Sequence, residues 1–245
     1  MSSRPRALLI MGGDAYHNLP EHYEAIAGLF AGPAGCNIVV IDDLPSQTHA
    51  TLSGYDLIVL WTTMGKGPPE AIGALFDVVR EGTPLIGLHA APYTVRMVEG
   101  GPEAIGCSYI KRFPHLPYQT IKVDIADVAH PISQGVKSFS ILDELYCLED
   151  LPSDATVLAS YDGRAASAQY VIPEGREPNP AHADAHAWRM TQTHAPLVYT
   201  KPLGKGHVVV NALGHDGQAL TTPGFRQLTV QAAQWLLTGA NLTAH

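Results

Sequence analysis

The stretch PLIGLHAAPY, residues 84–93, joins a short apolar run directly to a histidine. Leu85–Leu88 has the length and composition of a buried β-strand. Ala90 and Ala91 are small enough to let the chain turn tightly into the segment that follows. We therefore expect His89 to stand where a strand ends, and we looked for other strands that end in the same way.

The first half of the chain alternates such apolar runs with segments of helical periodicity. Runs that are apolar throughout are typical of strands buried on both faces, and helices between them indicate parallel βαβ units. The sequence therefore predicts an α/β fold with a doubly wound, mostly parallel sheet flanked by helices. The predicted strands are Ala7–Met11, Asn37–Ile41, Asp56–Trp61, Leu85–Leu88, Thr120–Ile125, Thr156–Ser160, Ala168–Ile172, Leu197–Thr200 and His207–Ala212. The predicted helices are Glu21–Phe30, Glu70–Arg80 and about Phe225–Leu237.

The strands between about 120 and 172 follow one another with little helix between them, which favours an antiparallel extension of the sheet. No linker divides the sequence, so we expect one domain over residues 1–245, with a Pro/His-rich loop at about 173–195. Within that loop, HADAH at 182–186 spaces two histidines as in helical zinc sites, but its surroundings favour a lid over a structural metal site.

The amino-acid composition and net charge of the chain restrict the kinds of molecule that it is expected to bind. The chain has 245 residues, 46% of them hydrophobic, and a formal net charge of −8 without any Lys/Arg cluster. This argues against nucleic acid or an anionic membrane as partner. Three dispersed cysteines without a CxxC pair, no signal-peptide core and no membrane-length apolar run predict a cytoplasmic protein. A small molecule is the expected partner, and the composition is equally compatible with a monomer or a homo-oligomer.

Three histidines follow predicted strands that are far apart in the sequence. His17 comes after the first strand, His89 ends the strand described above, and His215 follows the last strand in the motif LGHD. Parallel strands end at one edge of the sheet, where ligands bind in open α/β folds. Each histidine alone is readily explained as a surface or capping residue, but three in one class of position favour a shared site.

The motif DELY, residues 143–146, adds carboxylates. Adjacent side chains of an extended segment point to opposite faces, so Glu144 and Tyr146 share one face while Asp143 and Leu145 share the other. The leucine face is expected to meet the core. We therefore predict that Glu144 and Tyr146 point into the crevice and that Asp143 bonds backbone groups, with a solvated acidic turn as the alternative.

Taken in order, these segments resemble the trehalose-utilisation (ThuA-like) family over about residues 7 to 237. The matching motifs are the Gly-Gly loop with His17, GLHAA at 87–91, HPI at 130–132, DELY at 143–146, PLVYT at 196–200 and GKGHVVVNALGHD at 204–216. The resemblance implies a class I glutamine amidotransferase-like (flavodoxin-like) fold and a role in sugar metabolism, with oxidised 3-keto sugars as the associated substrates. The chain departs from the family pattern in KRFPHLP, which puts the equivalence of His115 in doubt, and in the loop at 173–195.

Amidotransferases carry a nucleophilic cysteine at the sharp strand-to-helix turn, where this chain has His89 and no nearby cysteine. Glutaminase chemistry is therefore not expected. A histidine at this turn suits proton transfer or metal ligation. We predict a carbohydrate-active isomerase, lyase or hydrolase that uses acid–base chemistry. The alternative is a non-catalytic carbohydrate-binding or regulatory protein that kept the shell and lost the nucleophile.

The predicted catalytic residues are His89, Glu144 and His215. The predicted substrate-binding residues are Gly12, Gly13, Asp14, His17, Tyr146 and Asp216. Asp216 could either orient His215 or cap the next helix. A divalent ion of the zinc or manganese type is a candidate cofactor, with His17, His89 and His215 as ligands alongside Glu144.

Overall fold

The computed structural model describes residues 3–13, 19–64, 67–109, 115–165 and 180–238. Its centre is a nine-stranded sheet in the order β2-β1-β3-β4-β11-β10-β9-β6-β7, and β5 and β8 form a separate two-stranded sheet. The strands are β1 (Arg6–Ile10), β2 (Asn37–Ile41), β3 (Leu57–Leu60), β4 (Leu85–Leu88), β5 (Ser108–Tyr109), β6 (His115–Ile125), β7 (Phe139–Tyr146), β8 (Leu148–Glu149), β9 (Thr156–Tyr161), β10 (Ala195–Leu203) and β11 (Gly206–Asn211).

One half of the large sheet is parallel. Strand β1 pairs with β2 and β3, and β4 pairs with β3 and β11, all in the same direction. The residues of β3 and β4 are buried throughout, as expected for strands covered on both faces. The predicted parallel α/β fold is confirmed in this half.

The other half is antiparallel. Strand β10 pairs with β11 and β9, and β6 pairs with β9 and β7, each in opposite directions. The predicted antiparallel extension is therefore present. The hairpin between β10 and β11 turns through Gly204, whose φ of 63° is in the left-handed region that glycine adopts without strain.

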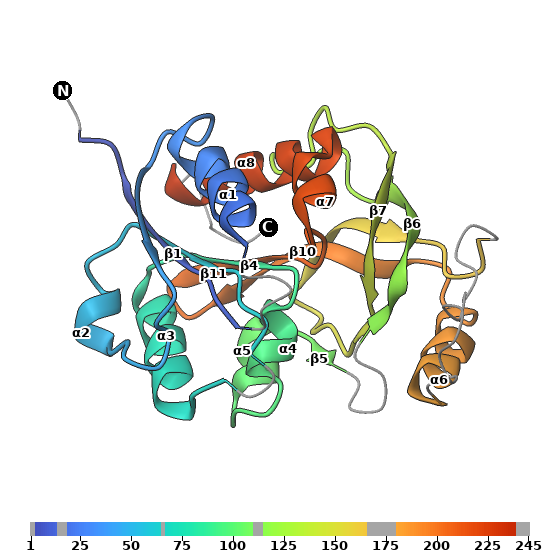
Figure 1. Ribbon diagram of the computed structural model, residues 1–245, viewed down its shortest axis with the longest axis horizontal. Coiled ribbons are helices and arrows are strands. Elements are labelled where there is room, and N and C mark those ends of the chain that lie inside the picture. Colours follow the sequence, from blue (N-terminus) through green and yellow to red (C-terminus); the bar gives the residue numbers. More distant parts are fainter. Residues whose placement is uncertain (1–2, 14–18, 65–66, 110–114, 166–179, 239–245) are drawn as a thin grey trace.

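Helices cover both faces of the sheet (Figure 1). Helices α1, α7 and α8 pack together on one face, and α2 to α5 lie on the other. Successive side chains of a strand point to opposite faces of the sheet, so the core consists of two apolar clusters, one on each face. Leu9 belongs to one of these clusters and Leu8 to the other. The helices are α1 (Pro20–Ala31), α2 (His49–Leu52), α3 (Pro69–Glu81), α4 (Ala91–Val95), α5 (Gly101–Ile105), α6 (Pro180–Arg189), α7 (Gly217–Thr221) and α8 (Pro223–Leu237).

Two sequence-based expectations differ from the structure. The apolar run Asn37–Ile41 was expected to be buried on both faces, but β2 is an edge strand, and Asn37, Val39 and Val40 are exposed. The Pro/His-rich stretch predicted as a loop contains helix α6 from Pro180 to Arg189. The predicted strand Ala168–Ile172 lies outside the described residues.

In the described part of the chain, no helix has both the length and the apolar character that a membrane crossing requires.

Candidate active site

His89 occupies a sharp turn between β4 and α4. Its φ is 48°, which is uncommon for a residue with a side chain and occurs where surrounding contacts impose the conformation. One such contact is the bond from the His89 N–H to the Asn211 carbonyl, at 2.8 Å, which ties the turn to the end of β11. The imidazole is fully buried. The sequence placed His89 at the sheet edge where ligands bind, and the structure shows that its imidazole is not accessible to solvent there.

Strand β7 brings the carboxylate to this turn. Glu144 Oε2 lies 3.7 Å from His89 Nε2, and the glutamate side chain is 15% exposed. Tyr146, two residues further on the same face, places its ring edge-on to His89 with centroids 4.8 Å apart. The period of two along β7 puts both side chains on one face, as the alternation in DELY predicted, but Tyr146 is buried in the apolar core and does not line an open crevice.

His215 approaches the same carboxylate from the loop after β11. Its Nδ1 lies 3.2 Å from Glu144 Oε2, and its ring centroid is 5.2 Å from that of His89. The loop is fixed by Asp143, which accepts bonds from the backbone N–H groups of Gly214 at 2.6 Å and His215 at 3.2 Å. Asp143 thus bonds backbone groups, as the sequence suggested. It also connects β7 to the loop that carries His215.

Two further residues reach the cluster. The sequence left the role of His115 in doubt and did not single out Tyr118. His115, at the first position of β6, places Nδ1 at 3.7 Å from Glu144 Oε2. Tyr118 packs its ring against His215, with centroids 5.6 Å apart, and its hydroxyl donates to Asp216 Oδ2 at 2.6 Å. The spacing of His115 and Tyr118 in PHLPY gave no helical or strand-end signal that would have marked them.

The electrostatics of the cluster favour a proton on His215. Burial lowers the pKa of His215, but the hydrogen bond and charge of Glu144, with the charges of Asp143 and Asp216, outweigh it and raise the pKa. Burial also raises the pKa of Asp143 to about 7, against the opposing effect of its backbone N–H donors. Burial, reinforced by the nearby carboxylates, raises the pKa of Tyr146 far above its usual value, so its phenol keeps its proton.

The cluster could also hold a metal ion. His89, Glu144 and His215 each offer one ligand atom, and these three atoms lie within 4.8 Å of one another. Among the described residues, this is the group of His, Cys, Asp or Glu side chains that is close enough to share an ion. Two imidazoles and one carboxylate are a donor set that zinc and related divalent ions accept. His17, the third histidine of the predicted ligand set, lies outside the described residues.

The remaining predicted site residues that the structure describes, Gly12, Gly13 and Asp216, contact other loops and a helix end. Gly13 packs closely on the loop after β3, because a β-carbon there would come within 2.5 Å of Thr63 Oγ1. Gly12 accepts a bond from the Thr63 N–H at 3.2 Å, so both glycines have a structural role in joining these two loops. Asp216 caps α7, accepting from the Ala219 N–H at 2.9 Å. Of the two alternatives for Asp216, the capping one is thus observed. Asp14 lies outside the described residues.

Of the two HADAH histidines, His186 takes no part in the cluster. It lies on α6, where His186 Nδ1 is 3.0 Å from Nη2 of Arg189, one turn further along the helix. The three cysteines are free and buried. Burial raises the pKa of the Cys107 thiol to about 12, and that of Cys147 also to about 12. Thiols of this kind are poor nucleophiles because the reactive thiolate is disfavoured.

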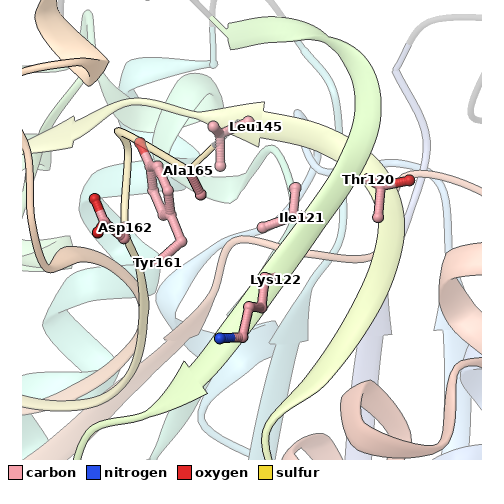
Figure 2. Close-up of a pocket in the computed structure, with 7 residues that line it drawn as sticks. All are labelled: Thr120, Ile121, Lys122, Leu145, Tyr161, Asp162 and Ala165. Carbon is pink, nitrogen blue, oxygen red and sulfur yellow. The ribbon is translucent and has the colours of Figure 1, made fainter. Parts of the chain in front are cut away.

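A small cavity lies between β6, the end of β9 and Leu145 of β7 (Figure 2). Its volume of about 10 Å³ is close to that of a single water molecule. Its lining residues are Thr120, Ile121, Lys122, Leu145, Tyr161, Asp162 and Ala165. It is too small for a sugar, and Glu144, one residue before Leu145, points to the other face of the strand.

Comparison with known proteins agrees with this architecture. The family model described as "ThuA: Trehalose utilisation" matches residues 6–236. A ThuA-like protein from Bacteroides uniformis is similar in structure with a TM-score of 0.71 and 18% identity, over 96% of this chain and 93% of that one. A cytoplasmic protein from Salmonella typhimurium LT2 has a TM-score of 0.64 and 14% identity, over 94% and 99% of the two chains.

A glutamine amidotransferase from Thermotoga maritima shares the fold with a TM-score of 0.53 and 11% identity, over 96% of this chain and 99% of that one. No curated protein is significantly similar in sequence. At these low identities the structural similarities show only the fold. The family model matches nearly the whole chain and is therefore the comparison that shows the family.

Proposed function

The chain belongs to the ThuA family, described as trehalose utilisation, and from this premise we propose that it is an enzyme acting on a sugar or a 3-keto-glycoside. The reaction class is isomerisation, elimination or hydrolysis by acid–base chemistry. One observation carries the proposal: His89, His115 and His215 all face the same oxygen of Glu144, at 3.7, 3.7 and 3.2 Å.

Such a cluster suits a reaction that begins with removal of a proton next to a ketone. That step needs a base for the carbon-bound proton and an acid for the developing oxyanion. His215, with its raised pKa, is the natural acid. Glu144 and His215 have side chains that are 15% and 21% exposed, so both present part of their surface to solvent. His89 lies beneath them and would exchange protons with Glu144 rather than with solvent.

A divalent ion bound by His89, Glu144 and His215 is the alternative form of the same site, in which His215 would be a neutral ligand and not the proton-carrying acid. When bound, such an ion would polarise a substrate carbonyl and so assist proton removal. His115, whose Nδ1 is 3.7 Å from Glu144 Oε2, would then hold the carboxylate in place by a charge contact. The ligand set is a proposal from the donor chemistry, and its test is independent of turnover.

The experiment is a panel of 3-keto-glycosides and their parent sugars incubated with the chelator-treated protein, with and without added Zn²⁺ or Mn²⁺, followed by sugar analysis. We expect product from at least one keto-sugar. The Glu144→Gln variant should form far less, and His49→Ala, which alters an exposed histidine paired with Glu81, should match the wild type. Saturable sugar binding without product under every metal condition would contradict the proposal and indicate a carbohydrate-binding protein instead.

Metal binding is tested separately by elemental analysis after dialysis against Zn²⁺ or Mn²⁺. We expect one ion per chain in the wild type and loss of that ion in His215→Ala. Equal metal content in both proteins would place any ion elsewhere.

A further inference from the structure

The edge strand β2 is unusual for the end of a sheet. Its sequence, NIVVI, has no charged residue and no proline, and Val39 and Val40 are 37% and 39% exposed. Natural edge strands are generally protected by lysine, proline, a bulge or a covering segment, because an open edge pairs readily with another strand. Strand β2 pairs with β1 in continuous register, without a bulge.

The hydrogen bonds to β1 show which groups of β2 are directed outward. The Asn37 N–H donates to the Pro5 carbonyl at 2.7 Å, and the Ile41 carbonyl accepts from the Met11 N–H at 2.8 Å. Hydrogen-bonding groups alternate in direction along a strand, so the N–H and C=O groups of Ile38 and Val40 point away from β1. This edge therefore offers two donors and two acceptors to a further strand.

We propose that the chain forms a dimer in which β2 pairs antiparallel with β2 of a second copy, about a two-fold axis at Val39. This register places Ile38 opposite the partner's Val40, so that each pair exchanges both backbone hydrogen bonds. Val39 then meets the partner's Val39 across the axis, and the exposed valines become cross-strand apolar pairs. The two large sheets join into one continuous sheet.

The charges that flank β2 are complementary in this register. The exposed Arg4 guanidinium binds the Gly35 carbonyl at 2.9 Å and the Ala31 carbonyl at 2.6 Å, just before the strand begins. Asp43 is exposed just after the strand ends. Antiparallel pairing centred on Val39 brings the end of β2 that carries Arg4 to the end of the partner strand that carries Asp43, so charges of opposite sign meet at both ends of the interface.

The opposite edge of the sheet does not offer the same surface. Strand β7 carries Glu144 and is contacted by α7. The Asp143 side chain of β7 also holds the loop at Gly214. A second copy is therefore the occupant that β2 favours, because an identical strand supplies matching apolar pairs and places charges of opposite sign at both ends of the interface.

Sedimentation velocity over a wide range of concentrations tests the dimer. We expect wild-type protein to reach twice the chain mass of 26.2 kDa. Val40→Pro removes an outward N–H without removing a bond to β1, so it should sediment as a folded monomer. Val128→Lys alters an exposed valine outside β2 and is the control, which should remain dimeric. A wild type that is monomeric throughout would overturn the proposal, as would a folded Val40→Pro dimer.

A charge exchange tests the register without altering β2 itself. Arg4→Glu alone places two acidic groups at each end of the interface, and Asp43→Arg alone places two basic groups there, so each variant should dimerise more weakly than wild type. An equimolar mixture of the two should recover the dimer, because each acidic end then meets a basic end. Unchanged dimerisation of both single variants, or no recovery on mixing, would exclude this register.

Discussion

The parallel and antiparallel halves of the sheet contribute to the candidate site in different ways. The parallel half supplies His89 from the end of β4 and His215 from the loop after β11. The antiparallel half supplies Glu144 from within β7 and His115 from the first residue of β6. Parallel strands all end at one edge, so the position of a residue along its strand indicates where it lies. Neighbouring antiparallel strands end at opposite edges of the sheet, so the position of a residue along its strand does not indicate at which edge it lies.

The site lies where the two halves meet, and Asp143 connects them. Its carboxylate accepts from the N–H groups of Gly214 and His215, on the loop after β11, and from that of Glu144, on its own strand. One carboxylate therefore sets the position of His215 from one half relative to Glu144 from the other.

The largest expected effect is on Glu144, the carboxylate that the antiparallel half supplies. Glu144→Gln keeps the shape of the side chain and removes its charge, so turnover of the accepted sugar should fall at least about a hundredfold, the range for a lost acid–base group. Steady-state kinetics measures the change, with His49→Ala as the exposed control. A well-folded Glu144→Gln protein with normal turnover would place the chemistry outside the cluster around Glu144.

The matching substitution in the parallel half is His89→Gln, which should lower turnover by a similar factor, again about a hundredfold or more. Because His89 is fully buried, its replacement should also reduce the free energy of unfolding, unlike Glu144→Gln. Urea denaturation of both variants separates the two contributions. Equal stability of the two proteins would contradict the buried position of this imidazole.

The connection between the halves is tested by Asp143→Asn. The amide keeps one oxygen as acceptor but replaces the other with an NH2 donor, so at least one of the backbone N–H groups loses its acceptor and faces a donor, and the free energy of unfolding should fall by about 1–3 kcal/mol. Turnover should fall with it, since Glu144 and His215 would lose their relative position. Asp124→Asn, an exposed aspartate of β6, should change stability by less than about 0.5 kcal/mol. If the two variants were equally stable, Asp143 would not join the halves.

His115→Gln should have a smaller effect. The imidazole is 29% exposed and 3.7 Å from Glu144, and partly exposed ion pairs contribute about 0–1 kcal/mol. Turnover should therefore fall by less than about tenfold, with the Michaelis constant as a second readout. A loss as large as that of Glu144→Gln would make His115 an acid–base residue in its own right.

The smallest effect is expected at the cysteines. Cys107 and Cys147 are buried thiols with raised pKa values, and neither occupies the turn at His89. Cys107→Ala and Cys147→Ala should keep wild-type turnover per folded molecule. Inactive but folded variants would show that a thiol takes part in the reaction.

The residues that sequence reasoning located well share a local signal. β2 and β4 were predicted with their observed bounds, and the alternation in DELY placed Glu144 and Tyr146 on one face of the extended segment. The expectations that were wrong depended on distant neighbours. Burial of β2 depends on whether a strand lies beyond it, and the helix at 180–189 has the proline and histidine content of a loop.

The sequence by itself determined the parallel half of the sheet and the histidine at its edge, because continuous apolar runs and turn residues are local properties of the chain. Only the tertiary structure decided which groups surround Glu144 and how deeply His89 is buried. It also decided that β2 lies at the edge of the sheet that the described residues form. These features depend on contacts such as that of Asp143 with Gly214, 71 residues apart, whose energy arises only when the two halves fold together.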